Sequence, residues 1–184
     1  MNGLNGINEN HFDVIIVGAG ISGINAAYRV QDQLPGYTYT ILEARADLGG
    51  TWDLFKYPGI RSDSDLFTFG FQFNPWSRDN PIAEGSAIKQ YVRDTAAKYG
   101  IDQHIRYNHR LSSADWSSDE NTWSLSVNHN DSEQTYTARY VIFGTGYYNY
   151  KDPLKADIPG LDAFQGQIVH PQFWPENLQY KDKK

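Results

Sequence analysis

Residues 13–23 read DVIIVGAGISG, and this stretch decides the fold of the chain. Val14–Val17 is a short run of apolar, β-branched residues, which is typical of a strand buried on both faces of a parallel sheet. Gly18, Gly20 and Gly23 follow in the spacing G-x-G-x-x-G, and a helical pattern of apolar residues begins at once. A strand, a glycine-rich turn and a helix in this order are typical of a dinucleotide-binding domain.

The three glycines have different expected roles. Gly18 allows the tight turn, Gly20 lets the backbone approach a pyrophosphate, and Gly23 permits close packing of the helix against the strand. The free N–H groups at the start of the helix, together with the positive end of its dipole, would face the phosphates.

A second strand is predicted over 37–42, and it ends in Glu43, twenty positions after Gly23. A carboxylate at this place can accept hydrogen bonds from both hydroxyls of an adenosine ribose. The alternative is a parallel-sheet domain whose glycines serve packing alone. Strand, glycines, helix and acid together favour the dinucleotide site.

Composition limits the class of protein. The chain has 184 residues, which suits one substantial α/β core, and a formal net charge of −6, which disfavours nucleic acid and anionic membranes as partners. The absence of cysteine excludes disulfides, zinc–thiolate sites and a cysteine nucleophile. The start of the chain carries no apolar signal core, and no apolar run approaches the length of a membrane span. We therefore expect a cytoplasmic protein.

Residues 49–65, GGTWDLFKYPGIRSDSD, form the second informative stretch. They show neither helical nor strand periodicity but are rich in glycine, proline and aromatic residues, which is typical of a ligand-binding loop. Thr51 could donate to a phosphate, and Trp52 could line a flat ring. Arg61 and Asp63 supply one charge of each sign. The alternative is an ordinary surface loop in which these two residues form a solvated pair.

Periodicity predicts the remaining elements. A helix with Ser86 as its N-cap is expected, and then a short parallel strand, a three-stranded antiparallel meander and a last buried strand. Residues 66–76 alternate aromatic and polar residues, which predicts a packed extended segment. The fold class is therefore α/β, a Rossmann-like parallel sheet with an inserted three-stranded antiparallel β-meander. The predicted ranges are 86–99, 104–107, 110–116, 122–128, 134–138 and 140–143.

Four stretches of this chain resemble the flavoprotein monooxygenases: 18–23, 49–65, the GTGYY of 144–148, and 164–175. The last reads FQGQIVHPQFWP and matches the fingerprint F-x-G-x-x-x-H-x-x-x-W-P of the type I Baeyer–Villiger monooxygenases. Within these the chain is most similar to the subgroup of the ethionamide-activating mycobacterial enzyme. The related flavin-containing monooxygenases usually have Tyr or Phe followed by Lys where this chain has Trp174-Pro175, which favours the Baeyer–Villiger branch.

This resemblance implies a domain organisation. Residues 1–150 would be the N-terminal part of an FAD-binding Rossmann-like domain, and 151–184 a linker that carries the fingerprint. In the family, which is more than twice as long, the fingerprint leads into an NADPH-binding domain. We therefore expect this chain to be a fragment that is inactive alone.

The resemblance also implies a reaction. In the family NADPH reduces FAD, the reduced flavin adds O₂ to give a C4a-peroxyflavin, and this attacks a ketone to yield an ester or lactone. The implied partners are O₂ and a small-molecule ketone or sulfide, without nucleic acid or a membrane span. The alternatives are an amine or sulfide monooxygenase of the same fold, a non-catalytic FAD-binding module, and an NAD-linked dehydrogenase, in which 49–65 would have no role.

Single residues receive roles from the same resemblance. Glu43 would bind the ribose, Leu111 would contact adenine through its backbone, and Thr145 would lie near the phosphate–ribose region. Asp63 would be catalytic, because it would orient an arginine of the NADPH-binding domain that stabilises the peroxide anion. The pyrophosphate would be held by Gly18, Gly20, Ser22 and Gly23; the flavin side would be flanked by Thr51, Trp52, Asp53 and Leu54; the nicotinamide would lie by Arg61, Ser62 and Asp63.

The histidines are not predicted to do acid–base chemistry or to bind a metal. A histidine in an extended linker, such as His170, is more often structural or exposed, and the resemblance implies that it couples domain movement. His11, His104, His109 and His129 do not have the spacing of metal ligands.

Overall fold

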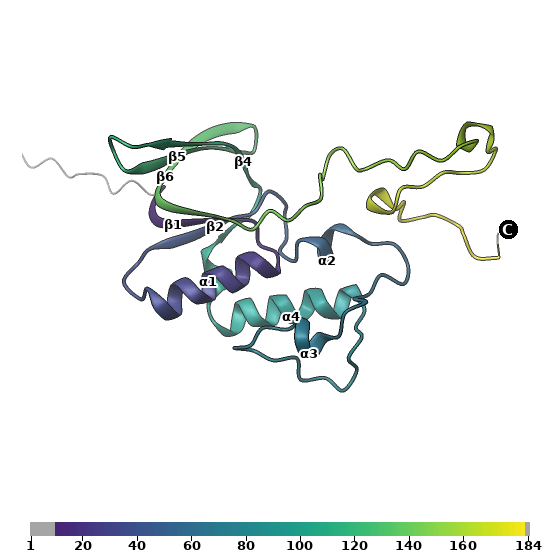
Figure 1. Cartoon of the computed structure of the whole chain (residues 1–184), viewed down its shortest axis with the longest axis horizontal. Coiled ribbons are helices and arrows are strands. Elements are labelled where there is room, and N and C mark those ends of the chain that lie inside the picture. Colours follow the sequence, from purple (N-terminus) through teal and green to yellow (C-terminus); the bar gives the residue numbers. More distant parts are fainter. Residues whose placement is uncertain (1–9, 183–184) are drawn as a thin grey trace, which may run out of the picture.

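The computed structural model describes residues 10–182, which form one mixed six-stranded sheet with helices packed on it (Figure 1). The strand order β3-β2-β1-β6-β5-β4 confirms the predicted Rossmann-like class with its meander. Residues 1–9 and 183–184 lie outside the described part, and the expected absence of a signal core falls on the first of these ranges.

The strands are β1 His11–Val17, β2 Tyr39–Leu42, β3 Ile105–Arg106, β4 His109–Ser117, β5 Thr122–His129 and β6 Ser132–Phe143. The helices are α1 Ile21–Gln33, α2 Thr51–Leu54, α3 Leu66–Phe69 and α4 Gly85–Lys98, with 3-10 turns at Ile101–His104, Leu161–Ala163 and Pro171–Phe173.

The centre of the sheet is parallel. β1 pairs with β2 on one side and with β6 on the other, so that Ile15 lies between Thr40 and Val141. Val14–Val17 and all of β2 are buried, as their apolar runs predict. The carboxyl ends of these three strands therefore meet at one edge, beside the start of α1.

Strand β6 corrects the prediction of two separate strands over 134–138 and 140–143. It is continuous: its first half pairs antiparallel with β5, and its second half pairs parallel with β1. Burial of 140–143 was also predicted wrongly, because Tyr140, Ile142 and Phe143 are exposed. Pairing with β5 stops at Ala138, so β5 does not cover this end of β6.

The helical layer is built largely as predicted. α4 differs from the predicted range by one residue at each end, and it buries Ile88 and Val92 against the core that α1 shares with the sheet. Its N-cap position is Glu84, not Ser86, and no side chain caps it. The extended segment predicted over 66–76 is wrong at its start. There Asp65 accepts the backbone N–H of Thr68 at 2.9 Å and begins the short helix α3.

Residues 151–182 form an extended arm that leaves the body beyond the end of β6 (Figure 1). Several apolar side chains of the arm are exposed, among them Leu154 at 93% and Phe164 at 58%. One link to the residues before it is the hydrogen bond from Gln172 Nε2 to the carbonyl of Asn149, 2.8 Å long. Across residues 10–182, no helix has the length and apolarity that crossing a bilayer requires.

Candidate functional site

The glycine-rich turn is fixed by backbone packing. Gly18 has φ +101°, and a Cβ there would lie 2.6 Å from the carbonyl oxygen of Gly144. A Cβ on Gly23 would lie 1.9 Å from the carbonyl oxygen of Gly18, so no side chain fits at position 23. Because of these approaches, the end of β1, the first turn of α1 and the end of β6 are in direct backbone contact.

Gly20 differs from these two, since it faces another glycine. A Cβ on Gly20 would lie 3.5 Å from the Cα of Gly50, and a Cβ on Gly50 would lie 3.0 Å from the Cα of Gly20. Side chains here would fill the space between the turn and the loop before α2. The absence of side chains on both residues therefore lets the backbone of the turn and the backbone of the loop before α2 approach each other closely.

A cavity of about 480 Å³ opens at this point. Its lining comes from the ends of β1, β2 and β6, the start of α1, the start of β4 and the loop leading into α2. This is the crevice at the carboxyl ends of parallel strands where α/β sheets bind their ligands. Of the residues that sequence analysis singled out, the lining includes Gly18, Gly20, Ser22, Glu43, Thr51, Trp52, Leu111 and Thr145.

The other predicted site residues do not reach the lining of this cavity: Gly23, Asp53, Leu54, Arg61, Ser62 and Asp63. Gly23 serves the packing described above. Arg61 pairs its backbone with Glu84, and the buried Ser62 donates its hydroxyl to the carbonyl of Ser64 at 2.7 Å. Asp63 is exposed on the same loop. The structure thus brings the 18–23 turn, Glu43 and Thr51-Trp52 together and leaves 61–63 apart from them.

The cavity also has lining residues that sequence reasoning missed. His109 and Arg110 come from the start of β4, and Tyr148, Tyr150 and Lys151 follow the GTG turn after β6. The two tyrosines had a signal, because they come shortly after a glycine turn at the end of a parallel strand. His109 and Arg110 had a signal only through their neighbour Leu111, which the resemblance places at the adenine, since local sequence does not show that β4 lies close to the end of β2. Arg110 and Lys151 add two cations, which favours an anionic ligand.

His109 is a structurally fixed member of the lining. Its Nδ1 donates to the carbonyl of Tyr107 at 2.6 Å, and its ring stacks on His129 with 4.1 Å between centroids. Burial lowers the pKa of His109, the hydrogen bond to the carbonyl of Tyr107 opposes this shift, and the proximity of His129 and Arg106 lowers the pKa further.

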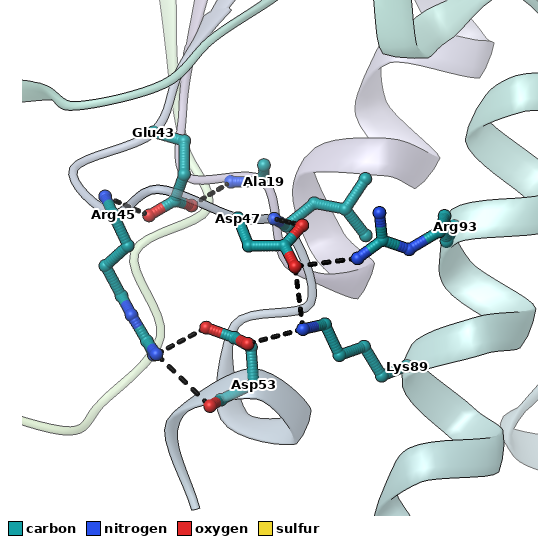
Figure 2. A network of polar contacts seen from close by, with 8 residues as sticks. Ala19, Glu43, Arg45, Asp47, Asp53, Lys89 and Arg93 are labelled. Atoms are coloured by element: carbon teal, nitrogen blue, oxygen red, sulfur yellow. Dashed lines mark hydrogen bonds and ion pairs between the residues drawn. The ribbon is translucent and has the colours of Figure 1, made fainter.

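Glu43 is 5% exposed and is held by two backbone donors. Its Oε2 accepts the N–H of Ala19 at 2.7 Å, and its Oε1 accepts the N–H of Arg45 at 2.9 Å (Figure 2). Burial raises the pKa of Glu43, and the two N–H donors oppose that shift. A carboxylate accepts about four hydrogen bonds, so each oxygen has capacity left for a ligand.

An ion-pair network lies behind this wall (Figure 2). The Asp53 carboxylate binds the Arg45 guanidinium on one side, and on the other its Oδ1 lies 2.6 Å from Lys89 Nζ. Lys89 also lies 2.8 Å from Asp47, which binds Arg93 at 2.7 Å. The side chain of Asp53 therefore points into the network. Within residues 10–182, no group of three or more histidine, aspartate or glutamate side chains could hold a metal ion.

This fold and this cavity define a Rossmann-like dinucleotide-binding domain. The family model described as NAD(P)-binding Rossmann-like domain matches residues 16–81. These residues include the glycine turn, Glu43 and the loop around Thr51-Trp52.

Curated relatives make the relationship more specific. Over 174 residues the chain is 54% identical to the FAD-containing monooxygenase EthA of Mycolicibacterium smegmatis, which covers 95% of this chain and 35% of that protein. It is 49% identical to the putative FAD-containing monooxygenase MymA of Mycobacterium tuberculosis, over 96% of this chain and 36% of that protein. The chain is therefore homologous to the FAD-containing monooxygenases and spans about a third of the length of these relatives.

Solved structures of monooxygenases are also similar to this chain. A steroid monooxygenase bound to NADP superimposes with a TM-score of 0.74 at 30% identity, covering 90% of this chain and 32% of the other. Cyclohexanone monooxygenase from Rhodococcus sp. Phi1 bound to NADP⁺ gives a TM-score of 0.75 at 27% identity, covering 92% and 32%.

Proposed function

We propose that this chain is the FAD-binding part of an NADPH- and O₂-dependent flavoprotein monooxygenase. The observation that carries the proposal is the cavity in which the 18–23 turn, Glu43 and Thr51-Trp52 meet. Homology to FAD-containing monooxygenases selects FAD among the dinucleotides that such a cavity could hold. Gly20 and Gly50 fit this ligand, because both line the cavity and neither has a side chain that would keep a pyrophosphate away from the backbone.

The residues of the cavity would hold FAD from one end to the other. The first N–H groups of α1 have no partner within the helix, so they would bind the pyrophosphate beside Gly20 and Ser22. Glu43 would accept the ribose hydroxyls with its remaining lone pairs, and the backbone of Leu111 would contact adenine. Thr145 would lie at the phosphate–ribose region, and Thr51 and Trp52 at the flavin side. When bound, FAD supplies the redox chemistry; the protein positions it.

We propose Baeyer–Villiger oxidation of a small ketone as the reaction of the whole protein. Support comes from the fingerprint of residues 164–175, which ends in Trp174-Pro175, and from the likeness to cyclohexanone and steroid monooxygenases. Asp63 would then be the catalytic contribution of this chain, through an arginine of the NADPH-binding domain. Oxidation of a sulfide or amine is the alternative, and product analysis of the full-length protein on a ketone and a thioether distinguishes the two.

The arm would be the linker between domains, over residues 151–184. In the arm His170 caps a 3-10 turn: its Nδ1 accepts the N–H of Gln172, and its Nε2 lies 3.2 Å from the carbonyl oxygen of Leu154. These local contacts support a structural role for His170 in placing the fingerprint. Acid–base chemistry at the flavin would require a position in the cavity lining, which His170 does not have.

A titration of the chain with FAD tests the proposal. We expect tighter binding of FAD than of NAD, and loss of binding in Gly20→Val, whose side chain would enter the space for the pyrophosphate. Gly36→Val is the matched control, since a Cβ on Gly36 meets no atom within 4 Å. Wild-type affinity for FAD in Gly20→Val, or tighter binding of NAD than of FAD, would contradict the assignment.

A further inference from the structure

Asp53 lies between the wall of the cavity and helix α4. α2 has four residues, Thr51–Leu54, and so short a helix is not stable by itself. Thr51 and Trp52 line the cavity, whereas the Asp53 carboxylate faces Lys89 of α4 (Figure 2). The contacts of Asp53 therefore help to fix the positions of Thr51 and Trp52.

Both oxygens of this carboxylate have cationic partners. Lys89 Nζ lies 2.6 Å from Oδ1, and the Arg45 guanidinium binds Oδ2. Arg45 Nη2 also donates to the backbone carbonyl of Asp53 at 3.1 Å. The Asp53 side chain is 9% exposed, so loss of either cation would leave a buried charge incompletely paired.

Arg45 connects this network to the opposite wall of the cavity. Its backbone N–H holds Glu43 Oε1, while Glu43 Oε2 holds the N–H of Ala19 in the glycine turn. Its guanidinium carbon lies 5.7 Å from the ring centre of Tyr150, another lining residue. Neither Arg45, Asp53 nor Lys89 is itself part of the lining.

We infer that Arg45, Asp53 and Lys89 are positioning residues of the dinucleotide cavity. They hold the Glu43 carboxylate and the Thr51-Trp52 wall in place for FAD without contacting it. This inference rests on the proposed function. It differs from a role in fold stability alone, because it requires FAD affinity and the environment of the flavin to change in a variant that still folds without FAD.

The test uses Lys89→Met in the full chain, with Lys98→Met as matched control. Lys98 lies on the same helix, and its Nζ bonds Asn74 Oδ1 at 2.8 Å on the exposed surface, outside the network. Three quantities are measured: the Kd for FAD, the visible absorption spectrum of the bound flavin, and the Tm without FAD. We expect Lys89→Met to weaken FAD binding about tenfold and to shift the spectrum. Lys98→Met leaves the affinity and the spectrum unchanged, and Lys89→Arg keeps both close to those of the unsubstituted chain. The Tm without FAD shows whether each variant folds.

The outcomes separate the inference from the proposed function. Absence of FAD binding in the unsubstituted chain overturns the proposed function and this inference with it. Wild-type affinity and spectrum in Lys89→Met overturn the inference alone, as does an equal loss in Lys98→Met. If Lys89→Met does not fold, Asp53→Asn replaces it, since this variant keeps the volume and one acceptor; unchanged FAD affinity there likewise overturns the inference.

Discussion

The cavity end of the body and the arm of residues 151–182 each carry a sequence motif. The two motifs differ in how strongly packing constrains their residues. In the body the motif is specified by packing: Gly18 and Gly23 are required by backbone approaches of 2.6 and 1.9 Å. In the arm the fingerprint residue Phe164 is 58% exposed. Backbone contacts between separate elements of the body therefore hold the first motif, whereas contacts of the second, such as the cap of His170 on Gln172, are local to the arm. The two motifs should therefore respond differently to substitution.

The largest expected effect is at Gly23. In Gly23→Val the new Cβ would overlap the carbonyl oxygen of Gly18, and neither backbone segment can move without separating α1 from β1. We expect a loss of about 3 kcal/mol or more in the free energy of unfolding, measured by urea denaturation. Gly36→Val, where no atom lies within 4 Å, should change it little. Equal stability of the two variants would contradict the packing role of Gly23.

The next effect compares two leucines. Leu125 in β5 is fully buried, and Leu154 in the arm is 93% exposed. Leu125→Ala should cost about 2–5 kcal/mol in the free energy of unfolding, because a cavity remains in the core. Leu154→Ala should cost less than about 0.5 kcal/mol. A cost at Leu154 near that at Leu125 would mean that the arm packs against the body in solution.

The smallest effect concerns pH. Burial raises the pKa of Glu43 above its ordinary value of 4.5. In the free chain the ionised Glu43 therefore lowers the free energy of unfolding at neutral pH. This destabilisation disappears as the pH falls through the raised pKa and Glu43 becomes protonated. FAD binding should respond in the opposite direction, since the ribose hydroxyls need the ionised carboxylate as acceptor. The Kd for FAD should therefore rise as pH falls through that pKa, and Glu43→Gln should bind more weakly at neutral pH without this dependence. A pH dependence that persists in Glu43→Gln would assign it to another group.

Local sequence predicted the parts of the molecule that local chemistry controls. The β1 turn, β2, α1 and α4, together with Glu43 and Thr51-Trp52 in the cavity, all follow from periodicity, glycine spacing or motif. The alternation of aromatic residues after Asp65 predicted an extended segment. The hydrogen bond from the Thr68 N–H to the Asp65 side chain instead begins helix α3 there. β6 looked like two strands because its two halves pair with different neighbours.

Contacts between distant residues could not be predicted. Lys89 lies 36 positions from Asp53, and nothing in the pattern of α4 distinguishes it from Lys98. The start of β4 reaches the cavity because the backbone N–H of His109 donates to the carbonyl of Glu43, just after β2, at 2.8 Å. These long-range placements decide which polar residues line the cavity and which stand behind it.

Amide hydrogen exchange with and without FAD tests the central claim most directly. The account predicts that FAD slows exchange at the amides of residues 18–23, 43–45 and 49–52, with little change along 152–182. Slower exchange confined to the arm, or no change at the glycine turn under saturating FAD, would contradict it.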